Sequence, residues 1–439
     1  MKKIALINHG CAKNLVDSEL MLGMLAEKGY EITLDDTDKD AEIVIINTCS
    51  FINDAERESV QSILQMIQDG KKVIVTGCLP QKHKDELKQA IPEISAMLGT
   101  SDFNKIVEVI ENIDKKDYEF ISDVNIKPKY VYPENVERQQ ITVGASSYIK
   151  IADGCNYHCG YCIIPNLRGA YQSRPIENIV AEAKDIAKKG CTEIVLIAQD
   201  TTSYGIDLYG EVKLVELLEE LNKIDELSWI RIMYAYPSHM SDELIDAIAR
   251  LDKVVKYVDL PLQHSHKDIL EAMRRPAFDY EELVNKIRDK IQNVTIRTAF
   301  IVGYPTETEE HFQHLYNFVK KMKFDKMGVF KYSREKNTIS YSMKQQISAK
   351  VKKQRHDKLM KLQQKISTEL NKKYIGKTLP CIIESFADNG LVVARSEHDA
   401  PEIDGLVYID TKKQVVPGDI EQVLITNSDA YDLYGVIEE

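Results

Sequence analysis

Three cysteines lie within eight residues of this 439-residue sequence, with the spacing C-x3-C-x2-C. They are Cys155, Cys159 and Cys162, and Gly154 and Gly160 supply permissive backbone at the edges of the loop. Thiolates that converge on one point suit an iron–sulfur cluster or zinc. Structural zinc takes four ligands, and no fourth cysteine or spaced histidine pair follows nearby. We predict that these three residues, the loop cysteines, hold a [4Fe–4S] cluster with one iron open for chemistry; a structural zinc site is the alternative.

Three further cysteines each follow a short apolar run that is typical of a β-strand. In chain order, Cys11 follows residues 2–8, Cys49 follows 42–47 and Cys78 follows 72–76. The carboxyl ends of parallel strands meet at one edge of a sheet, where ligands bind, so cysteines distant in sequence can meet there. We call these residues the strand-end cysteines and predict a second three-thiolate iron–sulfur site. A redox pair with a spare thiol is the alternative.

The segments that position these cysteines alternate between apolar strands and helical patterns. Residues 1–124 are predicted to form a parallel α/β sheet domain. One of its helices carries Val60, Ile63, Leu64 and Ile67 at helical spacing. A linker with two prolines is expected at 125–140.

Residues 141–373 are predicted to form a partial TIM-like (β/α)6 barrel, an α/β fold whose loops at the carboxyl ends of the strands carry function. The predicted strands are 147–152, 193–198, 229–235, 256–260, 295–302 and 327–331.

Several polar or flexible residues fall at the ends of these strands. Gln199 and Asp200 follow the second strand, Gln263 the fourth and Gly303 the fifth. Each taken alone is more often a helix cap or a solvated loop residue. Their shared position predicts a ligand rim, and Gly303 would let the backbone approach the ligand closely. No catalytic side chain is predicted beyond the cluster ligands.

The remaining segments are a basic helix and a small β domain. Residues 348–373 combine an apolar stripe with many lysines; we expect a helix packed on the barrel, with contact to ribosomal RNA as the alternative. Residues 374–439 are predicted to form a small antiparallel β-barrel with a turn at Asp388-Asn389-Gly390. Its expected strands are 377–386, 390–396, 405–409, 420–426 and 433–438. Such barrels often hold a nucleic acid or a protein.

Charge and hydropathy restrict the partners and the compartment. The net charge is −12, and residues 374–439 alone carry 4 basic and 13 acidic side chains. An acidic domain suits a basic partner better than a nucleic acid. The apolar run Ile4–Ile7 is too short for a signal-peptide core, and no run approaches the ~18 apolar residues of a membrane span. We therefore expect a cytoplasmic protein with reduced cysteines and no membrane partner.

The whole chain resembles the methylthiotransferases among the radical S-adenosylmethionine (SAM) enzymes. That family has an N-terminal three-cysteine domain, a radical SAM barrel with an aromatic residue such as Tyr161 before the last loop cysteine, and a C-terminal TRAM barrel. Five segments resemble the branch that modifies a ribosomal protein: Gly10–Glu19, Ile151–Cys155, Ile163–Gly169, Tyr234–Pro237 and Tyr332–Glu335.

The resemblance implies two [4Fe–4S] clusters and SAM, with Tyr161, Gln199, Asp200, Gln263 and Gly303 as expected SAM neighbours. It implies transfer of a methylthio group to the β-carbon of an aspartate in protein twelve of the small ribosomal subunit. The substrate would be this protein or the ribosome, and a reductant and a sulfur donor would be needed. A tRNA adenosine methylthiotransferase is the nearest alternative, although the acidic tail makes tRNA an unexpected partner. A two-cluster electron-transfer or scaffold protein is the alternative of another class.

Overall fold

The chain forms two compact units. The first comprises Met1–Ile141, Ala152–His158 and Cys162–Gln172; the second comprises Thr142–Ile151, Cys159–Tyr161 and Ser173–Glu439. The structure is a computed structural model that describes residues 2–50, 52–113, 121–125, 127–130, 132–133, 136–141 and 144–437. Parts of the predicted linker 125–140 and the end of the last predicted strand therefore lie outside the described residues. Most of the segment from 152 to 172 groups with the N-terminal residues.

A parallel sheet forms the centre of the first unit, as predicted. Its six strands run in the order β2-β1-β3-β4-β5-β6, and every pair is parallel. They are β1 (Lys3–Asn8), β2 (Glu31–Thr33), β3 (Ala41–Thr48), β4 (Lys72–Gly77), β5 (Ala96–Leu98) and β6 (Ile121–Asp123). The three predicted strands are confirmed. The other three have only three residues each, too few for a clear apolar pattern.

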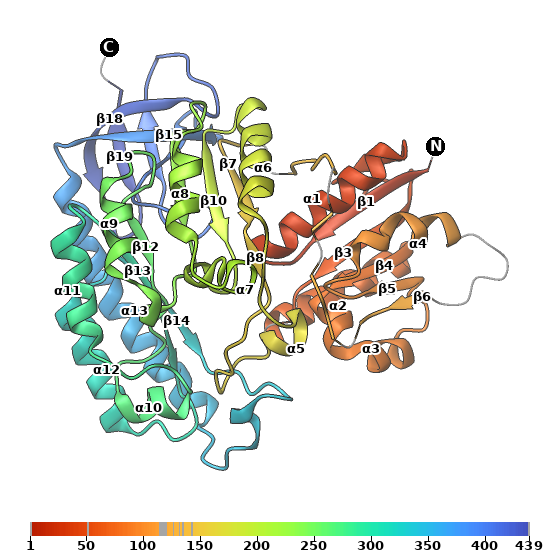
Figure 1. Ribbon diagram of the computed structural model, residues 1–439, viewed down its shortest axis with the longest axis horizontal. Coiled ribbons are helices and arrows are strands. Elements are labelled where there is room, and N and C mark those ends of the chain that lie inside the picture. Colours follow the sequence, from red (N-terminus) through yellow and green to blue (C-terminus); the bar gives the residue numbers. More distant parts are fainter. Residues whose placement is uncertain are drawn as a thin grey trace. The chain divides into compact units, whose positions relative to one another are not determined.

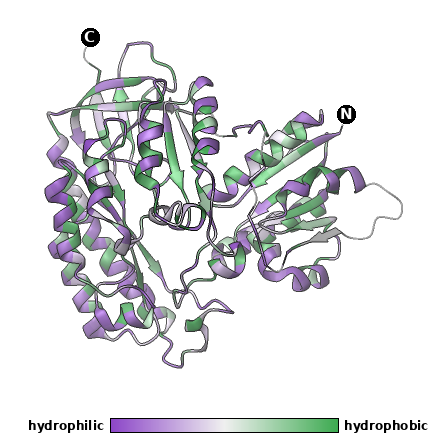
Figure 2. Cartoon of the chain, in the orientation of Figure 1, coloured by the Kyte–Doolittle hydropathy of each residue, from purple (hydrophilic) through white to green (hydrophobic). Residues whose placement is uncertain are grey.

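The helices of the first unit account for the continuous apolar runs in its central strands. These helices are α1 (Ala12–Glu27), α2 (Asn53–Gln68), α3 (Cys78–Ala90), α4 (Ile106–Asn112) and α5 (Ile164–Arg168). Consecutive residues Ile43 to Ile46 of β3 are all buried, as expected for a strand covered on both faces. Figure 2 shows the hydrophobic colour concentrated on the strands. Ile63 is buried on α2 as predicted, whereas Leu64 is 42% exposed and was wrongly included in the apolar stripe.

The second unit contains six parallel strands in chain order. They are β7 (Ser146–Lys150), β10 (Glu193–Ile197), β11 (Trp229–Ile232), β12 (Tyr257–Asp259), β13 (Thr295–Val302) and β14 (Lys326–Lys331). They form two three-stranded sheets, and a parallel bridge between Ile230 and Val254 joins β11 to the residues before β12. The partial (β/α)6 barrel predicted from the sequence is confirmed (Figure 1). Its strand ends therefore form the rim at which ligands are expected.

Helices follow the strands of this barrel, and several begin at the cap residues that their sequences predict. They are α6 (Ile176–Lys188), α7 (Ile206–Tyr209), α8 (Leu214–Asn222), α9 (Asp242–Arg250), α10 (Lys267–Ala272), α11 (Tyr280–Lys290), α12 (Glu309–Met322) and α13 (Ala349–Asn371). Asp279, Thr308 and Ser348 accept hydrogen bonds from backbone N–H groups of the helices that they cap. The predicted basic helix is α13, which packs on β14 and α12 and buries Leu359 and Ile366. Among the described residues, no helix is long and apolar enough to cross a membrane.

The C-terminal residues close into a five-stranded barrel in the order β15-β16-β17-β19-β18. The strands are β15 (Thr378–Phe386), β16 (Val392–Ser396), β17 (Val407–Asp410), β18 (Ile420–Ser428) and β19 (Leu433–Val436). The small barrel and its turn at Gly390, where φ is +84°, agree with the prediction. One feature departs from a purely antiparallel barrel, because β17 and β19 pair in parallel.

Buried charges join this small barrel to the partial barrel within the second unit. Glu193, at the start of β10, accepts a hydrogen bond from Arg231 Nε at 2.8 Å and pairs with Arg395 of β16. All three side chains are at most 1% exposed. Burial alone would raise the pKa of Glu193, but Arg395 and Arg231 lower it to about 2. The carboxylate is thus held ionised between two guanidinium groups.

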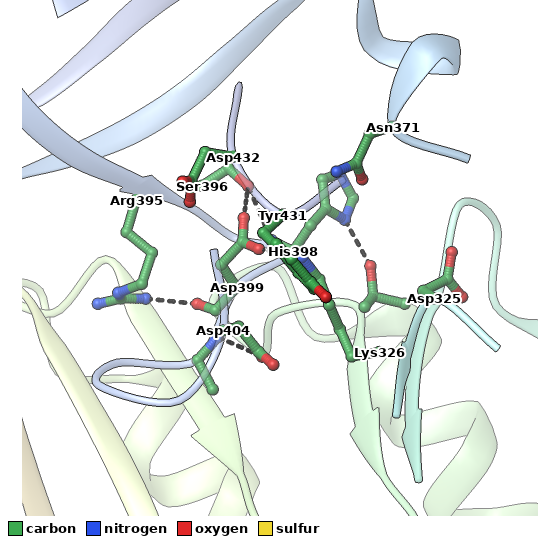
Figure 3. Close-up of polar contacts among 12 residues, drawn as sticks. Asp325, Lys326, Asn371, Arg395, Ser396, His398, Asp399, Asp404, Tyr431 and Asp432 are labelled. Carbon is green, nitrogen blue, oxygen red and sulfur yellow. Dashed lines mark hydrogen bonds and ion pairs between the residues drawn. The ribbon is translucent and has the colours of Figure 1, made fainter. Parts of the chain in front are cut away.

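Figure 3 shows a second part of this junction, around Asp399 and Asp404. Asp404 is buried; its carboxylate accepts hydrogen bonds from Tyr257 Oη at 2.5 Å and from the backbone N–H of Ala400 at 2.9 Å. Asp399 pairs with Lys326 at 2.5 Å. These acidic residues of the tail therefore hold the two barrels together and are not available to an outside partner.

Candidate iron–sulfur and cofactor sites

The sheet of the first unit brings the strand-end cysteines to one edge. Cys11 is the residue before α1, Cys49 directly follows β3, and Cys78 is the first residue of α3. Their strands β1, β3 and β4 are neighbours in the sheet. The strand order reverses between β1 and β3, which is the position where open α/β sheets bind ligands. Two of the three thiols also lie at helix N-termini, where the helix dipole favours a thiolate.

The three thiols influence one another electrostatically, as expected for groups that share one site. Burial raises the pKa of Cys78 to about 12; charges on Cys11 and Cys49 raise it too, and Arg168 lowers it. Desolvation by the surrounding atoms opposes ionisation of Cys11 and by itself would raise its pKa. Lys13 and Arg168, with backbone N–H groups, nevertheless bring the pKa of Cys11 below its ordinary value. Cys11 therefore ionises more readily than an ordinary cysteine, and thiolates are the ligands that iron–sulfur clusters need.

A buried amide pair fixes the start of α1 against the end of β3. Asn14 Nδ2 donates to Asn47 Oδ1 at 2.9 Å and to the carbonyl of Thr48 at 3.0 Å. Asn47 Nδ2 donates back to the carbonyl of Asn14 at 2.8 Å. A Cβ atom at Gly77, where φ is +93°, would lie 2.4 Å from Asn47 Oδ1. The segments that carry all three strand-end cysteines are thus held together by the Asn14 and Asn47 side chains and by the close approach of Gly77.

Arg168 joins helix α1, which begins directly after Cys11, to the segment before Cys155. Its side chain is 3% exposed and donates to Asp17 at 3.1 Å and to Asp153 at 2.9 Å. It also pairs with Asn14. Burial disfavours the charged form, but Asp153, Cys78, Asp17 and Cys11 raise the pKa of Arg168 well above its ordinary value. The guanidinium therefore stays charged beside the strand-end cysteines.

Cys155 and Cys162 of the loop belong to the same compact unit as the strand-end cysteines. The backbone N–H of Cys155 donates to the carbonyl of Gly169 at 3.0 Å. A Cβ atom at Gly154 would lie 2.1 Å from the carbonyl of Ala170, so only glycine fits there. Ile163, next to Cys162, packs with Cys78 and Leu167 in a small apolar cluster. The backbone around the first and last loop cysteines is thus held by the N-terminal unit.

The middle of the loop, Cys159 to Tyr161, belongs to the second unit. The N–H of Gly160 donates to the carbonyl of Met273 at 2.8 Å, and a Cβ atom on Gly160 would lie 2.5 Å from Tyr304 Oη. Tyr161 packs against an apolar cluster that contains Tyr304 and Tyr332. Cys159 is 8% exposed.

Arg275 places a positive charge beside the middle of this loop. It donates to the carbonyl of Pro261 at 2.7 Å and stacks 4.1 Å from the ring centre of Tyr236. Burial disfavours its charge, but Tyr161, Cys159 and Tyr236 raise its pKa. A fixed cation of this kind would offset the negative charge of thiolate ligands.

The predicted rim residues have different surroundings. Asp200 is buried at the start of a short turn and accepts hydrogen bonds from the Thr202 N–H at 2.9 Å and from Ser203 Oγ at 2.5 Å. Burial opposes its ionisation, but hydrogen bonds from His239, Ser203 and Thr202 lower its pKa. Asp200 thus orders the loop after β10. Its neighbour Gln199 is partly exposed, and a contact of either residue with SAM stays a prediction.

Gln263 and Gly303 both have positive φ angles, of +70° and +75°. The backbone of Gln263 bonds to Ala299 and Ile301 at 2.8 Å, which continues the sheet beyond β12. A Cβ atom at Gly303 would lie 2.3 Å from the Lys352 side chain. Glycine at 303 therefore makes room for Lys352, and a close approach to SAM stays a prediction.

Sequence reasoning did not assign roles to Arg168, Arg275, Asn14 or Asp17, which the structure places around the cysteines. The sequence of α1 did contain a signal for such roles. Asn14, Asp17 and Ser18 are polar residues on the face of a helix that must pack on a sheet, where apolar residues are expected. All eight cysteines lie in the described part of the chain, and none forms a disulfide. The remaining two, Cys191 and Cys381, are both buried.

Comparisons with known proteins follow the same three-part order. Residues 3–99 match the model described as Uncharacterized protein family UPF0004, residues 149–319 the Radical SAM superfamily, and residues 375–437 the TRAM domain. A solved radical S-adenosylmethionine methyltransferase, TsrM from Kitasatospora setae, aligns over 75% of each chain with a TM-score of 0.55 and 15% identity. This likeness concerns the fold alone. The matches and the cysteine pattern together define a radical SAM protein with an added three-cysteine domain and a TRAM barrel.

Curated relatives identify the branch. Ribosomal protein uS12 methylthiotransferase RimO of Caldanaerobacter subterraneus subsp. tengcongensis is 47% identical over 99% of this chain and 100% of its own length. The proteins of the same name from Thermoanaerobacter sp. and Desulforamulus reducens are 46% and 44% identical, over 99% and 100% of this chain. This chain belongs to the RimO family of methylthiotransferases.

Proposed function

We propose that this protein is a radical SAM methylthiotransferase that adds a methylthio group to the β-carbon of an aspartate in ribosomal protein uS12. The proposal rests on membership of the RimO family together with two sets of three cysteines. The strand-end cysteines would hold one [4Fe–4S] cluster and the loop cysteines the second. Three thiolates at each set leave one iron for an exchangeable ligand. Because the relatives are named for uS12, we also propose that the protein acts where ribosomes are, in the cytoplasm.

The residues around the cysteines would bind and orient these groups. When bound and reduced, a cluster on the loop cysteines would supply the electron for the reductive cleavage of SAM to methionine and a 5′-deoxyadenosyl radical. Arg168 and Arg275 would offset the charge of the thiolate ligands, since each guanidinium lies beside one set of cysteines. Asn14 and Asn47 would keep Cys11 beside Cys49. The chain thus contributes position and electrostatics, while the cofactors carry the chemistry.

The experiment is an anaerobic assay of the reconstituted, reduced protein with SAM and purified uS12. We expect 5′-deoxyadenosine and S-adenosylhomocysteine as products and a methylthio group on one aspartate, located by mass spectrometry of uS12 peptides. A matched reaction contains uS12 with that aspartate changed to asparagine and should give no modified peptide. Methylthio-adenosine in added tRNA, with unmodified uS12, would refute the proposed substrate and favour the tRNA branch. Absence of 5′-deoxyadenosine would refute radical SAM chemistry altogether.

A further inference from the structure

A histidine-rich cluster lies in the second unit, outside the cysteine loops. Two of its members, His266 and Asp268, are at the start of α10, and two others, His311 and His314, are in the first turns of α12. The rings of His266 and His311 have centroids 4.3 Å apart, and those of His266 and His314 are 5.0 Å apart. Three imidazoles and one carboxylate thus come from two different helices to one surface position.

The ligating atoms are close enough for a single ion. Those of His266, Asp268 and His311 all lie within 4.8 Å of one another. His311 Nε2 is 3.7 Å from Asp268 Oδ2, and His266 Nδ1 is 4.0 Å from the same oxygen. A zinc ion with bonds of about 2.0–2.1 Å holds tetrahedral ligands roughly 3.3 Å apart. Asp268 is 68% exposed and can turn towards the two imidazoles, and rotations of the imidazole rings would complete the tetrahedral spacing.

The surroundings of the imidazoles permit metal binding. The hydrogen bonds of His266 and His311 to backbone N–H groups are long, at 3.3 Å and 3.2 Å. In His266 the bond occupies Nδ1, the nitrogen that faces Asp268, and a metal bond would replace it. In His311 the bond occupies Nδ1, whereas Nε2 faces Asp268, so metal binding at Nε2 would move the ring proton to Nδ1 and release the Thr308 N–H. Both N–H groups lie at exposed helix starts, where water can take the place of the imidazole. Ser265 Oγ lies 2.9 Å from His314 Nδ1, which leaves His314 Nε2 available. If His314 binds through Nε2, its Nδ1–H can donate to Ser265 Oγ, and an oxygen acceptor at this position fixes the orientation of the ring.

We propose that His266, Asp268 and His311, with His314 beside them, form a binding site for a divalent transition-metal ion such as Zn²⁺, Co²⁺ or Ni²⁺. Imidazole nitrogen with one carboxylate oxygen is a donor set that binds these borderline ions, whereas Mg²⁺ and Ca²⁺ prefer oxygen ligands alone. The bound ion would tie α10 to α12. The site is separate from both cysteine sets and does not depend on the proposed function. Fe²⁺ supplied for cluster reconstitution would also occupy it and add to the iron counted per chain.

The test is titration of the full chain with Co²⁺ after anaerobic cluster reconstitution and removal of excess iron, when the thiols are occupied. We expect one saturable site per chain by calorimetry and a visible Co²⁺ spectrum without thiolate charge-transfer bands. H311Q should lower the affinity by about tenfold or more, and it preserves the helix cap because glutamine at the third helical position can still reach back. The pair H266A/H311Q should abolish saturable binding.

H356A is the matched control, because His356 also lies beside an aspartate, Asp357 at 3.1 Å, but has no second imidazole in the described contacts. It should bind Co²⁺ as the unmodified chain does. Thermal midpoints of the apo variants within the error of the unmodified chain would establish that they fold. Equal affinity in the H266A/H311Q variant, or no saturable Co²⁺ uptake by the unmodified chain, would overturn the proposal. A thiolate charge-transfer band that accompanies the binding would do the same.

Discussion

Replacement of Arg168 by methionine should loosen the first unit and weaken the strand-end cluster. Methionine matches much of the length of arginine but carries no charge and donates no hydrogen bond. Asp17 and Asp153, whose side chains are 6% and 2% exposed, would then be buried without their cation. Removal of one partner of a buried ion pair costs about 3–5 kcal/mol. At ~1.4 kcal/mol per tenfold change, openings of this region should become roughly a hundred- to several-thousandfold more frequent.

The assay is amide hydrogen exchange of the full chain, followed by mass spectrometry of peptides that cover α1 and residues 152–158. We expect faster exchange in these peptides and unchanged exchange in β13 and β14 of the second unit. The triple variant R168M/D17N/D153N removes all three charges together. This variant should recover much of the protection from hydrogen exchange, because it leaves no buried carboxylate without a cation. R168K should be intermediate, because lysine cannot reproduce the fork of donors.

Iron content gives a second measurement of the same reasoning. After reconstitution, R168M should retain the loop-cysteine cluster better than the strand-end cluster, because Arg168 lies beside Cys11 and Cys78. Exchange in α1 at the rate of the unmodified protein, together with a full iron complement, would refute the role that we assign to this guanidinium.

Three further predictions concern the cysteines, pH and the tail. Alanine at all three loop cysteines should leave about half the iron and abolish 5′-deoxyadenosine formation. Alanine at the three strand-end cysteines should also halve the iron but spare SAM cleavage. Full iron in either triple variant would contradict two independent sites. Glu193, between Arg231 and Arg395, has a pKa lowered from 4.5 to about 2. Its contribution to the free energy of unfolding, roughly 3 kcal/mol, is therefore present above pH 4.5 and is lost as the pH falls towards 2. The difference in thermal midpoint between the apo protein and E193Q should shrink over that range, and a constant difference would contradict the stabilising role of the ionised carboxylate. D410K, at an exposed position of the tail, should slow association with basic uS12 at low salt without a change in thermal midpoint. D404K should instead lower the thermal midpoint, because that carboxylate is buried. Slower association of D404K with an unchanged midpoint would show that Asp404 faces the partner.

Residues 374–439 show why the net charge of a sequence segment does not reveal which of its charged side chains are exposed. The net charge of −9 in residues 374–439 suggested that acidic residues such as Asp404 and Asp410 attract a basic partner. Asp410 is exposed, as that idea needs, but Asp404 accepts a hydrogen bond from Tyr257, which lies 147 residues away in the sequence. Hydropathy cannot separate the two aspartates, because a buried carboxylate is stabilised by partners that come from elsewhere in the chain.

The sequence alone determined the α/β class, the order of the three parts and the position of Cys11, Cys49 and Cys78 at strand ends. These features are local: a buried parallel strand is a continuous apolar run, and a cysteine that follows such a run must lie at a strand end. The predicted run 72–76 and the observed strand β4 (Lys72–Gly77) therefore differ by one residue. The link between Arg168 and Asp17, by contrast, spans 151 residues. Only tertiary structure decides such pairs, and likewise the three-residue strands at the sheet edges and the parallel pairing of β17 with β19. Their stability comes from neighbours brought together by folding, and no local pattern of residues encodes those neighbours.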